Sequence, residues 1–346
     1  MFAPVTTPFY PDERVYFRKI EANIAHYSRS LLAGIVVLGS TGEGVLLDDA
    51  ESRDVLRAAA EAAAPEKVLI AGIGRESVKA TVELAEAAAR FQYDAVLVRP
   101  PSYFAGQLPS AAVLYYFRSV ADRSPLPVLL YNIPKFVRYE IPVELIAELA
   151  QHPNIVGTKD SSGSVERISA TVEATSSAPR RTVPVTQVFE AVTARMLAPH
   201  AQEAGSDFVS VGNLAGGVMT TATSVAPMKT RTREVGFQVL CGSGSIVLES
   251  LQAGASGAIL ASADFAPQAC QEIYLAWKDH NAALAAVKQQ RFAAADERIV
   301  GDFGIAGIKY ACDFNGYYGG RVRAPLLQIT AEEKAEIERS LAEMRN

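Results

Sequence analysis

A lysine closes one of the most apolar segments of the chain. Lys159 ends the run Ile155–Lys159 and is followed by Asp160 and Ser161. A lysine at the end of a buried strand is partly desolvated, which favours its uncharged amine. A free amine attacks a ketone and forms a protonated imine, an electron sink that allows a carbon–carbon bond to form or break. Position alone also fits a strand-end lysine that extends to solvent without a chemical role.

Two further segments supply groups that such chemistry needs. Tyr131 ends the run Val128–Tyr131, so its hydroxyl could carry protons to and from the amine, or could lie at the strand rim without a role. Ser40 and Thr41 lie in the turn Gly39–Gly44, where backbone amides and two hydroxyls can converge on a carboxylate. The same turn could use glycine for a positive φ and a hydroxyl side chain as a helix cap.

Eight apolar runs, most of them followed by helix-forming segments, must position these residues. The runs are continuous rather than alternating in polarity, which is typical of strands buried on both faces of a parallel sheet. They are Ala3–Thr7, Ile35–Leu38, Val68–Ala71, Ala95–Val98, Val128–Tyr131, Ile155–Lys159, Phe237–Leu240 and Gly257–Leu260. Helices are predicted at Asp49–Ala63, Ser77–Arg90, Pro109–Asp122 and Pro142–Ala150. The pattern predicts an α/β fold, a closed (β/α)8 TIM barrel, with an open doubly wound sheet as the alternative.

Two segments fall outside this repeat. An insertion of about 175–235 separates the sixth helix from the seventh strand, with an amphipathic stretch around Gln187–Leu197 and a glycine-rich patch at Gly212–Gly217. Because it joins a helix to a strand, we expect it on the face opposite the site, with a role in packing or assembly. The barrel is thus assigned to 1–266 and a C-terminal helical region to 267–346. Its predicted helices are Pro267–Asp279, Ala282–Ile299, Gly304–Asp313 and Thr330–Met344.

The composition narrows the function classes. The 346 residues are 49% hydrophobic and 21% charged, with a net charge of −5, which fits a globular enzyme and argues against a nucleic-acid partner. No apolar run approaches the roughly 20 residues of a membrane span. The N-terminus enters a strand-like segment without a basic and then apolar leader. A cytoplasmic enzyme without a membrane partner is therefore expected.

Several other kinds of site are disfavoured. Three cysteines (Cys241, Cys270 and Cys312) have no CxxC pair, and four scattered histidines form no HxH or HxxxH pair, so neither a disulfide framework nor a metal site is expected. The sequence Gly72-Ile73-Gly74 lacks the third glycine and acidic partner of a dinucleotide site, and Gly39–Gly44 lacks the lysine of a P-loop. A metal-dependent aldolase is therefore the less favoured mechanism.

Four motifs together resemble the dihydrodipicolinate synthase/N-acetylneuraminate lyase family. In order along the chain, they are Val5-Thr6-Thr7-Pro8-Phe9, Gly39-Ser40-Thr41-Gly42-Glu43, Tyr131-Asn132-Ile133-Pro134 and Gly157-Thr158-Lys159-Asp160. The resemblance covers the chain except the insertion. The stretch His152–Gly157 and the ending Phe303–Lys309, Gly316–Gly320 and Arg323–Leu326 are most similar to the 4-hydroxy-2-oxoglutarate aldolase branch.

The resemblance implies a role for each residue. Lys159 would form the imine with pyruvate or the pyruvoyl half of a substrate, so that no bound cofactor is needed, and Tyr131 would move protons. Ser40 would link Tyr131 to a second tyrosine, Tyr103, which in this family commonly reaches the site of a neighbouring subunit. Thr41 and nearby amides would hold the carboxylate. Thr7, Ser161 and Gly242 complete the expected substrate-binding residues, in a homo-oligomer (a dimer or tetramer).

One departure from the family pattern bears on the substrate. The dipicolinate synthases have an arginine two residues after the Tyr-Asn-x-Pro motif, where it holds the carboxylate of the aldehyde; this chain has Phe136 there, flanked by Lys135 and Arg138. Aspartate semialdehyde is therefore disfavoured, unless Lys135 or Arg138 substitutes. Ser40, where the synthases usually have threonine, matches the hydroxyoxoglutarate branch.

The predicted function is a class I (Schiff-base) aldolase, a lyase that reversibly cleaves 4-hydroxy-2-oxoglutarate to pyruvate and glyoxylate. Two alternatives remain: a 4-hydroxy-tetrahydrodipicolinate (dihydrodipicolinate) synthase that condenses pyruvate with aspartate semialdehyde, and a non-catalytic 2-oxo-acid-binding homologue. Trapping of pyruvate on Lys159 separates an enzyme from the non-catalytic homologue, and the preferred aldehyde separates the two enzymes.

Overall fold

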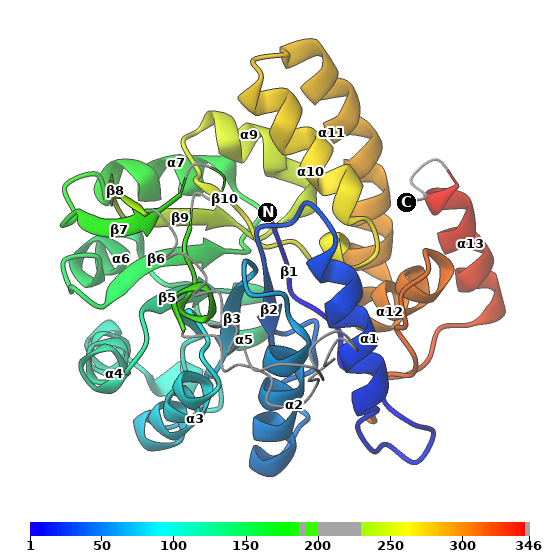
Figure 1. The fold of residues 1–346 in the computed structure, drawn as a ribbon, viewed down its shortest axis with the longest axis horizontal. Coiled ribbons are helices and arrows are strands. Elements are labelled where there is room, and N and C mark those ends of the chain that lie inside the picture. Colours follow the sequence, from blue (N-terminus) through cyan, green and yellow to red (C-terminus); the bar gives the residue numbers. More distant parts are fainter. Residues whose placement is uncertain (187, 189–190, 199–229, 343–346) are drawn as a thin grey trace, which may run out of the picture.

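A closed barrel of parallel strands forms the centre of the computed structural model, which describes residues 1–186, 188, 191–198 and 230–342. The strand order is β1-β2-β3-β4-β5-β6-β9-β10 (Figure 1). The strands are β1 (Phe2–Ala3), β2 (Gly34–Val37), β3 (Val68–Gly72), β4 (Ala95–Val98), β5 (Val128–Asn132), β6 (Ile155–Asp160), β9 (Gln238–Cys241) and β10 (Gly257–Ala258). A parallel bridge between Phe2 and Ile259 joins the first strand to the end of the last. The predicted TIM barrel is confirmed, and the open sheet is excluded.

Both faces of the barrel strands are buried, which explains their continuous apolar sequences. Successive residues of a strand point to opposite faces. In β2, Val36 belongs to the cluster inside the barrel, whereas Ile35 and Val37 belong to the larger cluster between the barrel and its helices. No position of such a strand faces water, so there is no polar alternation to read in the sequence.

Helices cover the outside of the barrel (Figure 1). Polar caps start several of them: Asp48 and Glu51 form a capping box at the start of α2, and Ser77 accepts the Ala80 amide hydrogen at the start of α3. The covering helices are α1 (Phe17–Ser28), α2 (Asp49–Ala62), α3 (Val78–Arg90), α4 (Ser110–Arg123), α6 (Val143–Leu149), α7 (Val165–Ala174) and α9 (Val247–Gln252). The four helices predicted in this part of the chain are all present.

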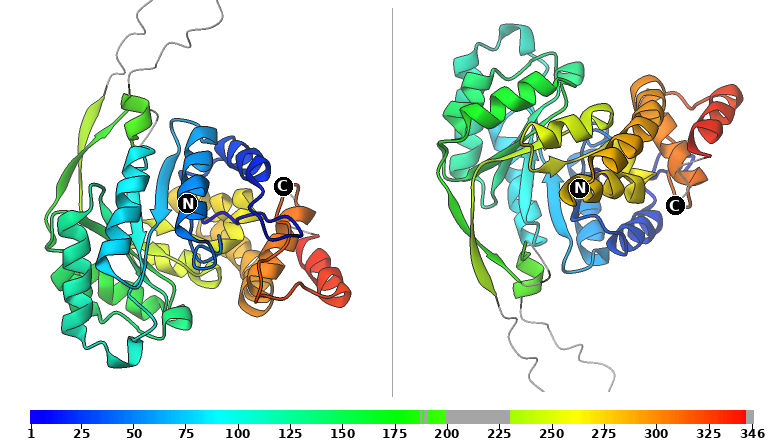
Figure 2. Two further views of the ribbon diagram at one scale, coloured as in Figure 1. Left: turned by 90° about the horizontal axis from the view of Figure 1, so that it is seen from below. Right: turned by 90° about the horizontal axis from the view of Figure 1, so that it is seen from above.

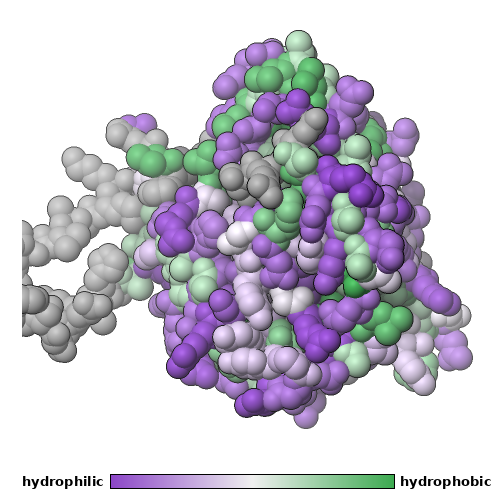
Figure 3. Space-filling view, turned by 90° about the vertical axis from the view of Figure 1, so that its right-hand side faces the viewer, coloured by the Kyte–Doolittle hydropathy of each residue, from purple (hydrophilic) through white to green (hydrophobic). Residues whose placement is uncertain are grey.

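The C-terminal helices pack beside this layer. They are α10 (Pro267–Lys278), α11 (Ala282–Asp296), α12 (Gly304–Phe314) and α13 (Ala331–Leu341). The predicted helix Ala282–Ile299 is interrupted, because α11 ends at Asp296 and the chain continues as a π-helix over Glu297–Asp302. Figure 3 shows the side of the molecule that is to the right in Figure 1; it is mostly hydrophilic, with hydrophobic residues in small groups.

The described part of the predicted insertion contains two strands that the sequence did not indicate. The strands β7 (Arg181–Val185) and β8 (Arg231–Val235) pair antiparallel and extend along one side of the molecule (Figure 2). Beyond β7, the short helix α8 (Ala194–Leu197) begins after Thr193, whose hydroxyl donates to the Pro65 carbonyl at 2.5 Å. Because Pro65 precedes β3, this contact lies at the barrel end opposite the carboxyl ends of the strands, as expected. The patch Gly212–Gly217 lies outside the described residues.

No helix in the described part of the chain is long and apolar enough to cross a membrane. The division at residue 267 stays a prediction.

Candidate active site

Two neighbouring strands bring Lys159 and Tyr131 together. The parallel register of β5 and β6 pairs Tyr131 directly with Lys159. The Lys159 Nζ donates to the Tyr131 hydroxyl at 3.3 Å and lies 4.4 Å from the centre of its ring. Lys159 is 5% exposed and Tyr131 6%. The Lys159 amine is therefore largely shielded from water and lies within hydrogen-bond reach of the Tyr131 hydroxyl.

The residues that follow this pair fix its position. Asn132 donates to the Asp160 carboxylate at 2.9 Å and accepts the Ile141 amide hydrogen at 3.0 Å. Arg167, on α7, donates to the same carboxylate at 2.8 Å. Asp160 is 2% exposed, so its charge is paired inside the protein. These bonds hold the ends of β5 and β6 in register and so limit the freedom of the Lys159 and Tyr131 side chains.

A turn after β2 forms the second part of the site. Ser40 Oγ lies 3.5 Å from the Tyr131 hydroxyl, at the limit of a hydrogen bond. The Ser40 carbonyl accepts the Glu43 amide hydrogen at 3.1 Å, and Thr7 donates to the Gly42 carbonyl at 2.6 Å. Thr7 therefore holds the turn from outside rather than lining the pocket.

A buried ion pair anchors this turn to the C-terminal helices. Glu43 and Lys309 form an ion pair with at most 1% of either side chain exposed. Lys309, on α12, also donates to the carbonyls of Thr7 at 2.7 Å and Arg321 at 2.6 Å. The Arg323 amide donates to the Glu43 carboxylate at 2.8 Å. Burial lowers the pKa of Lys309 and raises that of Glu43, although each partner opposes the other's shift.

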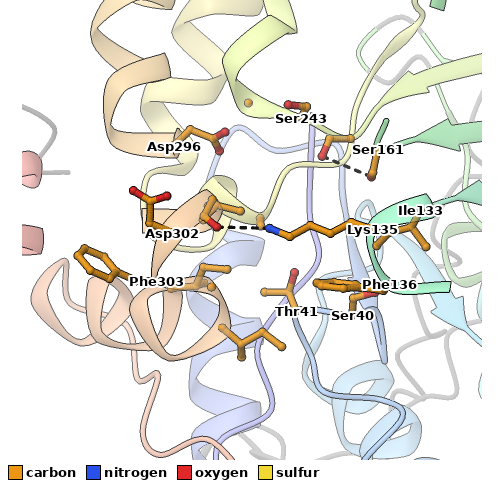
Figure 4. Close-up of a pocket in the computed structure, with 18 of the residues that line it drawn as sticks. Ser40, Thr41, Ile133, Lys135, Phe136, Ser161, Ser243, Asp296, Asp302 and Phe303 are labelled. Carbon is orange, nitrogen blue, oxygen red and sulfur yellow. Dashed lines mark hydrogen bonds between the residues drawn. The ribbon is translucent and has the colours of Figure 1, made fainter. Parts of the chain in front are cut away.

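These groups open onto a pocket of about 630 Å³ at the carboxyl ends of the barrel strands (Figure 4). Of the eight residues predicted for the site, six line it: Ser40, Thr41, Tyr131, Lys159, Ser161 and Gly242. Thr7 supports the turn from behind, as described above. Within one chain, Tyr103 lies elsewhere; it is 82% exposed, and its ring packs against Phe104. Its contribution to another subunit's site stays a prediction.

Glycine is required at position 242 because two backbone segments meet there. A Cβ at Gly242 would overlap the Ser161 hydroxyl and press on the Asp160 carbonyl and the Lys159 Cε. The Gly242 amide donates to that carbonyl at 2.6 Å. The loop after β9 can therefore lie directly against the end of β6.

Sequence reasoning missed one wall of the pocket. It comes from the π-helix Glu297–Asp302 and the following residues Phe303–Ala306, together with Leu326 and Leu327 near the C-terminus. The sequence Phe303–Lys309 belongs to this region and was noted only for its resemblance to the family. Its helical pattern did not indicate that the segment faces the site. A π-helix is often found at functional sites, but it has no clear sequence signal.

Asp296 lies where this wall meets the barrel. Its carboxylate accepts a hydrogen bond from Ser262 at 2.7 Å, and Gly244 packs so closely that a Cβ would overlap it. Burial raises the pKa of Asp296 to about 6, against the opposing hydrogen bonds from Ser262, Gly244 and Ser245. It thus titrates within the pH range in which an enzyme works.

Asp264 is a second buried acid in the barrel. Asp264 is fully buried, and neither carboxylate oxygen has a hydrogen-bond partner among the described residues. Burial raises its pKa well above the usual value, and the charge of Lys159 acts in the opposite direction. The described residues contain no group of three or more His, Cys, Asp or Glu side chains placed to hold a metal ion.

Comparisons with known proteins point to one family. The profile of the Dihydrodipicolinate synthetase family matches residues 1–179 and 203–344. The unmatched stretch is thus 180–202, shorter than the predicted insertion. Among curated relatives, a probable mitochondrial 4-hydroxy-2-oxoglutarate aldolase of Emericella nidulans is 29% identical, over 99% of this chain and 94% of its own.

A second relative has a different substrate in its name. The L-threo-3-deoxy-hexylosonate aldolase of Hypocrea jecorina is also 29% identical, over 99% of this chain and 95% of its own. Among solved structures, dihydrodipicolinate synthase of Bacillus anthracis superposes with a TM-score of 0.79 at 21% identity, covering 100% of this chain and 98% of its own. The two curated names agree on an aldolase but not on its substrate.

Proposed function

The chain belongs to the dihydrodipicolinate synthetase family, and from this premise we propose that it is a class I pyruvate-dependent aldolase whose Schiff-base nucleophile is Lys159. The observation that carries the proposal is the buried Lys159 amine, 3.3 Å from the Tyr131 hydroxyl on the wall of the pocket. The covalent imine takes the place of a bound cofactor.

The reaction follows from this arrangement. The Lys159 amine adds to the C2 ketone of a 4-hydroxy-2-oxo acid, and water leaves to give a protonated imine. A base removes the proton of the C4 hydroxyl, the C3–C4 bond breaks, and its electron pair passes into the imine to give an enamine and a free aldehyde. Protonation at C3 and hydrolysis return pyruvate and the amine. Tyr131, next to the amine, carries these protons, and Ser40 extends the relay.

The turn after β2 serves as the carboxylate site. Thr41 is 8% exposed and lines the pocket beside Ser40, so its hydroxyl and the neighbouring amides can bind the C1 carboxylate of the pyruvoyl half. Ser161 and Gly242 line the pocket near Lys159, where the rest of the substrate must lie.

We assign 4-hydroxy-2-oxoglutarate as the substrate, with pyruvate and glyoxylate as the products of its reversible cleavage. A relative named for this substrate matches along nearly the whole chain. Phe136, which lines the pocket where the synthases of this family have an arginine, supports a substrate other than aspartate semialdehyde. A homo-oligomer in which the exposed Tyr103 reaches a neighbouring site, and a cytoplasmic location, belong to the same proposal.

Reductive trapping tests the mechanism. Borohydride added with pyruvate should increase the mass of the protein by one pyruvic acid less one oxygen atom, and peptide mapping should place the adduct on Lys159. Lys159→Arg, which keeps the charge but not the reactive amine, is the control and should give no adduct. No adduct on the wild-type protein would overturn the proposal. Faster condensation with aspartate semialdehyde than with glyoxylate would assign the chain to the synthases.

A further inference from the structure

The far part of the pocket must recognise the aldehyde half of the substrate. The pyruvoyl half is taken up by Lys159, Tyr131 and the Ser40–Thr41 turn. The question is which charged groups remain for the other half. Of the described residues that line the pocket, the basic ones are Lys159 and Lys135, and the acidic ones are Asp296, Glu297 and Asp302.

Lys135 extends across this part of the pocket. It lies in the short helix α5 (Pro134–Val137) after β5, and its Nζ donates to the Gly301 carbonyl of the π-helix at 3.3 Å. In Figure 4 its side chain passes between Asp296 and Ser243 on one side and Thr41 and Phe136 on the other. Within the described part of the chain Lys135 forms no ion pair. Its ammonium is therefore held by a long bond to a neutral acceptor and can exchange it for an anion.

The acidic residues nearby are less free to act. Asp302 already pairs with Arg298 at 2.5 Å. Asp296 accepts a hydrogen bond from Ser262 at 2.7 Å. Glu297 is exposed, as Lys135 is, but its negative charge repels an anionic ligand. Lys135 is thus the pocket charge that is most available to a ligand.

We propose that Lys135 is the specificity-determining residue that binds an anionic group, a carboxylate, on the aldehyde half of the substrate. The inference rests on the proposed aldolase function and adds the residue that would hold the second carboxylate of 4-hydroxy-2-oxoglutarate. Aspartate semialdehyde also has a carboxylate, so the comparison of glyoxylate with aspartate semialdehyde described above decides between the two substrates. Arg138, the other basic residue of this loop, lies outside the residues that line the pocket, and the backbone at Arg138 is left-handed (φ 53°). It therefore serves as a matched control.

Two aldehydes of equal length test the proposal. Glyoxylate carries a carboxylate where glycolaldehyde carries a neutral hydroxymethyl group, so the ratio of their kcat/KM values in condensation with pyruvate isolates the charge. Lys135→Met should lower this ratio about 10- to 100-fold, the loss expected for one hydrogen bond to a charged group, mainly through the KM of glyoxylate. Lys135→Arg should keep most of the preference, and Arg138→Met should leave the ratio unchanged.

The two proposals can fail separately. If wild-type protein traps pyruvate on Lys159 but Lys135→Met changes both aldehydes equally or neither, the role of Lys135 is wrong and the aldolase function stands. A wild-type preference for glycolaldehyde would also overturn the second carboxylate. If pyruvate is not trapped at all, the aldolase function fails first.

Discussion

Replacement of Lys309 by methionine should destabilise the protein strongly, because it leaves the Glu43 carboxylate buried without its partner. Glu43 is 1% exposed and Lys309 also 1%. Removing one member of a buried ion pair typically costs about 3–5 kcal/mol. Glu43 can instead take up a proton. From a usual pKa of 4.5, neutralising it at pH 7 costs roughly 3 kcal/mol. We therefore expect the free energy of unfolding to fall by about 3–5 kcal/mol at pH 7.

The pH dependence of this loss has a definite sign. In the folded variant the pKa of Glu43 rises further above its unfolded value, so folding takes up a proton. The penalty is greatest above the folded pKa and shrinks as the pH falls toward the unfolded value. Between pH 7 and pH 5 the loss relative to the wild type should decrease by up to about 3 kcal/mol. Lys309→Met/Glu43→Gln, which removes the carboxylate as well, should recover stability at pH 7.

Urea unfolding followed by circular dichroism at pH 7 and pH 5 measures these values. Lys67→Met is the matched control. Lys67 is 7% exposed and donates to the carbonyls of Ser30 at 2.7 Å and Leu32 at 2.8 Å, without an ion pair among the described residues. It should lose less stability, with little change between the two pH values. A Lys309→Met loss that is independent of pH, or a double variant no more stable than the single one, would refute the reasoning.

Three further predictions concern the site. Tyr131→Phe should slow formation of the pyruvate adduct on Lys159 by about 10²- to 10⁴-fold. Ser40→Ala, which loses only a 3.5 Å contact, should slow adduct formation less than about 10-fold. Timed borohydride quenching followed by mass spectrometry measures the two rates. Asp264→Asn should remove a fall in the free energy of unfolding as the pH rises above the unfolded pKa of this acid, because burial raises the pKa of Asp264 in the folded protein. Urea unfolding at pH 5 and pH 7 that shows the same fall in the variant contradicts this. In the wild type, the free energy of unfolding should fall by roughly 3 kcal/mol as the pH rises from 4 to 6, since the pKa of Asp296 rises from 3.8 to about 6 on folding. Asp296→Asn should remove this fall, and a variant with the same dependence of stability on pH would count against it.

The barrel and the contact between Tyr131 and Lys159 could be predicted because their signals are local. A strand buried on both faces reads as a continuous apolar run, and the ends of neighbouring parallel strands meet at one edge. Tyr131 and Lys159 each end such a run, so their contact followed from the fold. The next residues of the two strands, Asn132 and Asp160, are joined by a hydrogen bond that holds the strand ends together.

Other parts depended on contacts that the local sequence does not contain. The first strand was predicted over Ala3–Thr7 but ends at Ala3, because Thr7 bonds Gly42 and Lys309 instead of continuing the ladder. The antiparallel pair β7–β8 escaped prediction because β8 is mostly exposed and rich in charged residues, so burial imposes no apolar pattern on it. The π-helix wall is placed at the site by contacts between segments far apart in the sequence, such as the bond from Lys135 to the Gly301 carbonyl.

Lys159 and Tyr131 are held in place by different contacts from those that hold the π-helix wall. Lys159 and Tyr131 are fixed by the register of two barrel strands, which a change in the C-terminal helices leaves intact. The wall is instead fastened to the loop after β9 by side chains of α11: Gln289 donates to the Gly244 and Ser245 carbonyls at 2.9 and 3.0 Å. Small shifts of α11 would therefore move Gly301, to which Lys135 is bonded, without changing the strand register that holds Lys159. The two relatives at 29% identity are both named as aldolases, for two different substrates.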